Sequence, residues 1–202
     1  MTEWNKTQRM QERLGVKDYY QGRPIIHRDS PVDGGVYLGE GQREAIVVDS
    51  EKYPKLRELY KKAKTKATKG GTIREEEILR AVYETVKEAM PNQNNEAVNN
   101  LISKAGLQRD RKVALDFFIE NGVGVCRHYA LACAALLELF KKKGWIGGKI
   151  SVDRNATNLG GHAWCRYTNS AGQVIILDVA RNYLGSLEKG NERWDYQRPE
   201  NY

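Results

Sequence analysis

Cys126 stands in a sequence context that suits nucleophilic thiol catalysis. Such catalysis needs a thiolate near neutral pH, whereas an unperturbed cysteine has a pKa of about 8.5, so the site must stabilise the anion. The segment GVGVCRHYALACAALLELFKKKG predicts a flexible segment with two glycines, followed by a long apolar helix with Cys126 at or near its first residue. A helix start supplies unpaired backbone N–H groups and the positive end of the dipole. Taken alone, a cysteine on an Ala-rich helix is more often a small buried hydrophobe.

Two later strand-like runs, HAWCRYT and VIILDVA, contain His162 and Asp178. Alternate side chains of a strand share a face, which groups His162 with Trp164. Asp178 lies in so apolar a run that burying its carboxylate is costly unless it is paired. An imidazole and a carboxylate are the base and the orienting group that a cysteine nucleophile needs, so Cys126, His162 and Asp178 form a candidate triad.

The turn between these runs decides whether His162 and Asp178 can meet. A three-residue hairpin loop at 170–172 has a glycine where the left-handed residue is required. That loop pairs Asn169 with Gln173 and, continued along the strands, makes His162 and Asp178 diagonal neighbours on one face. A four-residue loop would place them on opposite faces, so the register tests the triad.

The blocks GVCRHYA, GGHAW and IILDVA resemble the three signature blocks of the transglutaminase-like superfamily of papain-related enzymes. The resemblance covers roughly residues 110–185, and the blocks occur in the family's order. It implies a Cys-bearing helix packed on an antiparallel sheet, with Cys126 as nucleophile, His162 as general base and acid, and Asp178 as orienting carboxylate. The implied reaction is acyl transfer from an amide or peptide bond, without a cofactor, as a protease, a deamidase or amidase, or a transamidase.

Two further residues are weaker site candidates. Papain-type enzymes have a glutamine shortly before the nucleophile that helps to hold the oxyanion, and here Asn121 lies in that neighbourhood, beside the backbone N–H of Cys126. Asn121 suits a helix C-cap equally. Trp164 either walls the acyl pocket or packs in the core.

The order of predicted elements indicates an α+β fold. The segment 54–67 predicts a helix, a capping box of Thr72 and Glu75 opens the next one, and AVNNLISKAG and RKVALDFFIENG predict two more. The segments GGVYLGEG and EAIVVDS predict one or two strands or an irregular hairpin after a polar helical start, and the polar tail LEKGNERWDYQRPENY is expected to be peripheral. We expect residues 1–90 to be an extension packed on a catalytic core at 91–202.

Composition and charge narrow the class of protein. No run approaches the roughly 18 apolar residues of a membrane span, and the first residues lack a secretory signal, which favours the cytoplasm while leaving a non-Sec export route open. The net charge is +7, with basic clusters at 61–69, 109–112 and 141–143. These are either solvated helix faces or a surface that steers an acidic protein or peptide substrate. Nucleic-acid binding is not indicated, because no aromatic residues alternate with the basic ones.

Two alternatives compete with the enzyme hypothesis. Cys126, His128, Cys133, His162 and Cys165 are all potential zinc ligands, but their spacing on a helix and a strand points them apart, so no metal is expected. The second alternative is a transglutaminase-like binding module without activity. A rapid reaction of Cys126 with iodoacetamide near neutral pH would favour the enzyme.

Overall fold

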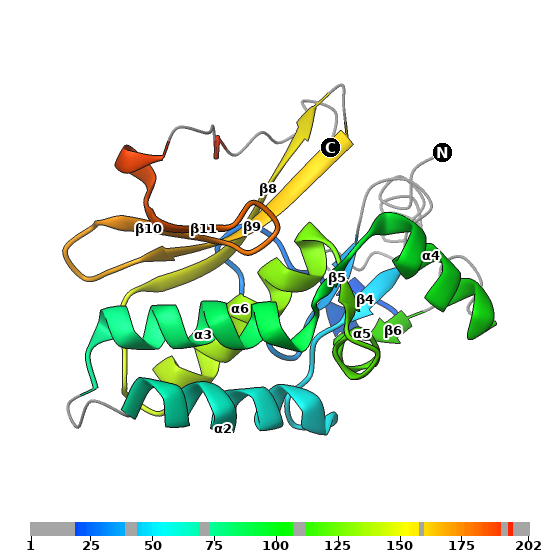
Figure 1. The fold of residues 1–202 in the computed structure, drawn as a ribbon, viewed down its shortest axis with the longest axis horizontal. Helices are drawn as coiled ribbons and strands as arrows, with labels where there is room; N and C mark the ends of the chain where they lie inside the picture. Colours follow the sequence, from blue (N-terminus) through cyan, green and yellow to red (C-terminus); the bar gives the residue numbers. More distant parts are fainter. Residues whose placement is uncertain are drawn as a thin grey trace.

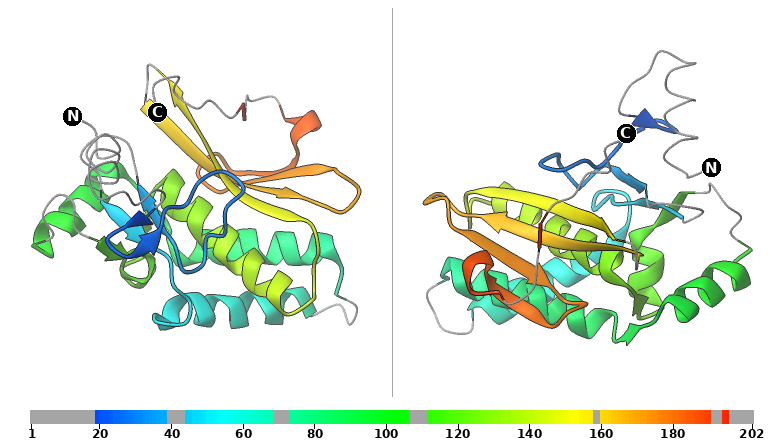
Figure 2. Two further views of the ribbon diagram at one scale, coloured as in Figure 1. Left: turned by 180° about the vertical axis from the view of Figure 1, so that it is seen from behind. Right: turned by 90° about the horizontal axis from the view of Figure 1, so that it is seen from above.

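The Cys-bearing helix lies at the centre of the molecule. The computed structural model describes residues 19–38, 44–68, 73–106, 112–157, 160–190 and 194–195. Helix α6 (Cys126–Lys142) has helices α2 (Pro54–Thr68) and α3 (Glu75–Ala89) on one side and a four-stranded sheet on the other (Figures 1 and 2). This mixture of helices and sheets confirms the predicted α+β class.

The sheet beside α6 is antiparallel and carries two of the candidate triad residues. Its strands are β8 (Lys149–Thr157), β9 (Gly160–Thr168), β10 (Val174–Asp178) and β11 (Tyr183–Ser186), in the order β11-β10-β9-β8. The N–H of Asn169 donates to the carbonyl of Gln173 at 3.0 Å, and Gly172 has a φ of +82°. The predicted hairpin loop and register are therefore confirmed, whereas β11 was not predicted.

Helices α2 and α3 pair beside α6, as their amphipathic patterns require (Figure 1). Helix α3 begins at Glu75, later than predicted, and the Glu77 carboxylate accepts from the N–H of Arg74 at 3.1 Å. Three glutamates in its first turn suit the helix dipole. The predicted cap residue Thr72 lies outside the described residues. The helix ends at Ala89, just before Met90-Pro91, as predicted.

The segment predicted as one helix at 111–122 divides into two elements. Strand β6 (Lys112–Ala114) pairs in parallel with β4 (Ala45–Val47), and only then does helix α5 (Leu115–Glu120) begin. Pairing with a distant strand outweighs the local helix propensity here, because β-branched Val113 becomes buried between neighbours. The preceding helix α4 (Asn95–Lys104) agrees with prediction, with an Asn94 cap that accepts from the N–H of Glu96 at 2.7 Å.

Short strands complete the fold. The two segments predicted as strands near the N-terminus form an antiparallel pair, and the predicted polar helix before them lies outside the described residues. Strand β3 (Val36–Leu38) pairs with β4, and β1 (Tyr19–Tyr20) pairs with β2 (Arg23–Pro24). Strand β5 (Asn92–Gln93) pairs in parallel with β7 (Val123–Gly124). A 3-10 helix (Leu187–Lys189) follows the last strand.

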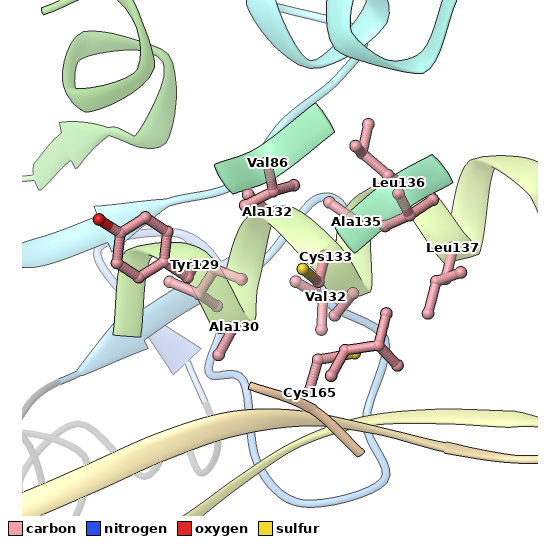
Figure 3. Packing of buried hydrophobic residues seen from close by; sticks show 14 of the residues in the cluster. Val32, Val86, Tyr129, Ala130, Ala132, Cys133, Ala135, Leu136, Leu137 and Cys165 are labelled. Carbon is pink, nitrogen blue, oxygen red and sulfur yellow. The ribbon is translucent and has the colours of Figure 1, made fainter. Parts of the chain in front are cut away.

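One hydrophobic cluster joins the helices to the sheet. Figure 3 shows the Ala- and Leu-rich helix α6, with Cys133 facing Cys165 of β9 and Val86 of α3 packed nearby. Leu136 and Leu137 are fully buried, so truncating either to alanine is expected to cost about 2–5 kcal/mol. The cluster rigidly fixes the N-terminus of α6 relative to β9 and β10. Within the described residues, no helix is long and apolar enough to cross a membrane.

Candidate active site

Cys126 is the first residue of α6, where the sequence predicted it. Two glycines allow the backbone path that leads into α6. Gly122 has a φ of +65°, and a Cβ on Gly124 would come within 2.9 Å of the Met90 sulfur. The N–H of Val125 donates to Nδ1 of His128 at 3.1 Å, which caps the helix start. The N–H groups of Cys126 and Arg127, in the first turn, have no intrahelical acceptor, and N–H groups at a helix start can stabilise a negative charge.

His162 and Asp178 meet on one face of the sheet. Nε2 of His162 lies 2.6 Å from Oδ2 of Asp178, and the two side chains are 13% and 1% exposed. The His162 ring and the backbone N–H of Ala163 lie beside the Cys126 thiol, close enough to act on its pKa. Because Asp178 occupies Nε2, Nδ1 is the ring nitrogen left for the thiol. The three residues thus stand in the order thiol, imidazole and carboxylate.

The electrostatics of the pair favour a thiolate and an imidazolium. Burial alone raises the pKa of Cys126, but the hydrogen bond and charge of His162 outweigh it and lower that pKa below its usual value. Burial alone lowers the pKa of His162, whereas hydrogen bonds to Asp178 and Cys126 raise it to about 9. Both shifts favour the charge-separated form near neutral pH, which is the reactive form of a cysteine nucleophile.

Asp178 is held by two donors besides His162. The indole Nε1 of Trp194 donates to Oδ2 at 2.8 Å, and the backbone N–H of Arg181 donates to Oδ1 at 3.1 Å. Trp194 is buried and stacks on Tyr183 at 4.4 Å between ring centroids. The prediction that the tail from residue 187 onward is peripheral is therefore wrong at Trp194. The one available signal was a tryptophan in a polar segment.

The two weaker candidates lie elsewhere. Asn121 is exposed and caps helix α5, with its amide nitrogen donating to the Phe117 carbonyl at 2.8 Å, so its amide group serves its own helix and not an oxyanion. Trp164 is 1% exposed and packs against Ile176 and Trp194, so it is a core residue and does not wall a pocket. It shares its strand face with His162, and the two rings stack at 6.0 Å.

The thiol lies where two surface recesses meet. Both are lined by Cys126, Arg127, Gly161 and His162. The first is a narrow recess of about 20 Å³ over the β8 edge of the sheet, and its further lining residues are Tyr37, Arg154, Asn155 and Ala163. The second, about 390 Å³, extends toward helix α4, and its further lining residues are Gln93, Asn94, Asn95, Val125, Ala180 and Arg181. A substrate could therefore extend from the sulfur in two directions.

A buried ion pair supports the helix start next to the nucleophile. Nη2 of Arg127 lies 2.7 Å from Oε1 of Glu44, and Nε2 of His128 lies 3.1 Å from the same oxygen. Burial raises the pKa of Glu44, but the hydrogen bond from His128 and the charge of Arg127 outweigh it and lower the pKa to about 2. The sequence did not indicate this pair, whose members are separated by 83 residues.

The other potential metal ligands are dispersed. Cys133 and Cys165 are fully buried, and burial raises the pKa of both thiols, so they are inert packing residues as expected. Within the described ranges, no three His, Cys, Asp or Glu side chains gather as a ligand set. The zinc hypothesis therefore has no support from this arrangement.

The chain matches no family model, no curated protein and no solved structure. The transglutaminase-like resemblance consequently depends on the three sequence blocks and on the geometry described above.

Proposed function

We propose that this protein is a cysteine-nucleophile acyl-transfer enzyme of the transglutaminase-like type that acts on amide or peptide bonds. The observation that supports this most is the position of His162, which is bonded to Asp178 at 2.6 Å and lies beside the thiol at the N-terminus of α6, where it lowers the pKa of that thiol. A merely structural histidine does not need a cysteine on one ring nitrogen and a buried carboxylate on the other.

The reaction begins with attack of the Cys126 thiolate on the carbonyl carbon of the acyl donor. The carbonyl oxygen takes up the negative charge, and the N–H groups of Cys126 and Arg127 stabilise it. His162 then gives its Nδ1 proton to the leaving amine as the carbon–nitrogen bond breaks. The products of this half-reaction are a free amine, a thioester on Cys126 and a neutral imidazole.

Resolution of the thioester returns the enzyme to its starting state. His162 removes a proton from the second nucleophile, which attacks the thioester carbonyl and releases the Cys126 thiolate. Water as the nucleophile gives hydrolysis or deamidation, and an amine gives transamidation. The two recesses give the acyl group and the second nucleophile separate places on either side of the sulfur.

The carboxylate of Asp178 holds the His162 ring in the orientation that both half-reactions need. Asp178 fixes the ring so that Nδ1, and not Nε2, faces the sulfur, and it stabilises the imidazolium that donates the proton. Trp194 and the N–H of Arg181 in turn fix the carboxylate. We propose a protein or peptide as the acyl donor, since both recesses lie on the open surface.

The test is to incubate the purified chain with a heat-denatured protein lysate and to measure both released ammonia and new amino termini. Ammonia reports deamidation or transamidation, and new termini report peptide cleavage. We expect one of the two to rise with wild type and to stay at background with Cys126→Ala. That variant should keep the fold, because a methyl group replaces a partly exposed helix-start thiol. Equal release by both proteins would refute the proposal and leave the inactive binding module.

A further inference from the structure

The narrow recess beside the thiol has room for one small molecule. It is about 20 Å³, and Cys126, His162 and Asn155 of β8 all line it. One water molecule needs a space of roughly 10–15 Å³, so the recess holds about one. The second recess at the thiol, about 390 Å³, is large enough for the chain of an acyl donor. The two recesses therefore suit groups of very different size.

Asn155 supplies the narrow recess with a buried polar group. The residue is 9% exposed, and its Oδ1 atom is buried and meets no hydrogen-bond donor within the described residues. Of the buried polar side-chain atoms that lack a partner in the described ranges, it is the one that lines either recess at the thiol. Buried acceptors are nearly always satisfied in folded proteins, by the protein or by ordered water. This oxygen is therefore suited to a donor that enters the recess from outside the chain.

Asn155 lies directly opposite the histidine of the triad. Asn155 of β8 and His162 of β9 are partners in the antiparallel register. Such partners lie on one face of a sheet, with their Cβ atoms about 4.5–5.5 Å apart. One water molecule can therefore bond to the Asn155 oxygen and to a ring nitrogen of His162 at the same time. Because Oδ2 of Asp178 holds Nε2, that nitrogen is Nδ1.

We propose that the narrow recess holds the second nucleophile of the reaction, that Asn155 positions it, and that the size of the recess restricts it to water. The inference rests on the proposed function, and it selects hydrolysis over transamidation for the thioester on Cys126. Oδ1 of Asn155 accepts one hydrogen of the water. Nδ1 of His162 removes the other as the water oxygen bonds to the thioester carbon. The carbon–sulfur bond then breaks, which releases the carboxylic acid and leaves the Cys126 thiolate beside an imidazolium.

The test forms one acyl-enzyme and measures how it is resolved. The p-nitrophenyl ester of N-benzyloxycarbonylglycine is activated enough to acylate a reactive thiolate whatever the natural substrate is, and its acyl chain fits the larger recess. The protein is incubated with this ester and with glycinamide at about pH 8, where much of this α-amine is neutral. Mass spectrometry quantifies the transfer product, N-benzyloxycarbonylglycylglycinamide, against the hydrolysis product, N-benzyloxycarbonylglycine. The amounts formed with Cys126→Ala are subtracted.

Wild type alone gives the first result, which does not depend on a variant folding. The reference is the free thioester of the same acyl group with 2-mercaptoethanol, which both water and glycinamide can reach. We expect the ratio of transfer to hydrolysis in wild type to be about tenfold or more below this reference, because glycinamide does not fit the recess. A wild-type ratio equal to the reference refutes the inference and leaves the proposed function standing, since the acyl-enzyme still forms on Cys126. Wild type that forms no more product than Cys126→Ala would remove both.

Asn155→Ala tests the role of the residue itself. The shorter side chain removes the acceptor for water and widens the recess, so we expect the ratio of transfer to hydrolysis to rise by about tenfold, the effect of one hydrogen bond. The ratio counts only acylated protein, so an inactive fraction does not alter it. The matched control is Asn100→Ala, the same change at an exposed position of helix α4, and it should keep the wild-type ratio. A ratio in Asn155→Ala equal to that of wild type would overturn the assignment to Asn155.

Discussion

The indole N–H of Trp194 and the carboxylate of Asp178 are 2.8 Å apart, and both groups are buried. Trp194→Phe keeps the stacking on Tyr183 but removes this donor from a carboxylate that also holds His162. Because hydrogen bonds to charged groups contribute about 1.5–3 kcal/mol, we expect the free energy of unfolding to fall by that amount and kcat to fall with KM unchanged. Urea unfolding and turnover measure the two effects.

The control for Trp194 is Trp145→Phe, since Trp145 is 41% exposed and follows the C-terminal end of α6, the end opposite to Cys126. That variant should change the free energy of unfolding by less than about 0.5 kcal/mol. If Trp194→Phe behaves like this control in both measurements, Trp194 does not position Asp178.

Asp178→Asn is expected to lower kcat without abolishing it. Asparagine removes the charge that stabilises the imidazolium and disturbs the tautomer of His162, but the thiol and the ring remain. We expect a loss of about 10² to 10⁴-fold, smaller than that of Cys126→Ala. The exposed neighbour of Trp194, Asp195, supplies the control as Asp195→Asn. Equal rates for wild type and Asp178→Asn on one substrate would make Asp178 merely structural.

The dependence of activity on pH follows from the two shifted groups. Because the pKa of Cys126 is lowered, its thiolate forms at a lower pH than that of an ordinary thiol. The pKa of His162, about 9, sets the pH at which the imidazolium loses its proton. Turnover should therefore fall as pH rises through about 9. In Asp178→Asn the support for the proton on His162 is removed, so this alkaline limb should move to lower pH. An alkaline limb at the same pH in both proteins would show that His162 does not set it.

Glu44 should make the fold sensitive to acid. Its pKa is lowered from 4.5 to about 2, and a depressed carboxyl pKa stabilises the fold above the unfolded-state pKa and loses that contribution as pH falls toward the folded-state pKa. At about 1.36 kcal/mol per pKa unit, the contribution is about 3 kcal/mol. Glu44→Gln should lose about this much at pH 7 and show a flatter stability profile between pH 4.5 and 2.

The comparison for Glu44 is Glu51→Gln, which breaks the exposed pair with Lys142 at 3.3 Å. Exposed ion pairs contribute little, so its free energy of unfolding should change by less than about 0.5 kcal/mol. Chemical unfolding from pH 7 to pH 3 measures both variants. A profile for Glu44→Gln that parallels wild type across this range would contradict the role of the buried pair.

Features set by neighbouring residues could be predicted from the sequence, and features set by distant partners could not. Gly172 fixed the hairpin loop, and with it the meeting of His162 and Asp178, because turn chemistry is local. The helix start at Cys126 was equally local. By contrast, β6 became a strand because it pairs with β4, and Trp194 reached Asp178 through folding of the C-terminal segment. The polar segment around Trp194 has no hydrophobic periodicity from which that contact could be inferred.

The central claim is that His162 keeps Cys126 as a reactive thiolate. The most direct test is the second-order rate constant for alkylation of Cys126 by iodoacetamide at pH 6.5, compared between wild type and His162→Ala, with the peptides of Cys126, Cys133 and Cys165 quantified separately. We expect rapid, selective labelling of Cys126 in wild type, a loss of about tenfold or more in His162→Ala, and almost no labelling of the two buried cysteines. A Cys126 that reacts no faster than an ordinary thiol, or equally fast in both proteins, would contradict the claim.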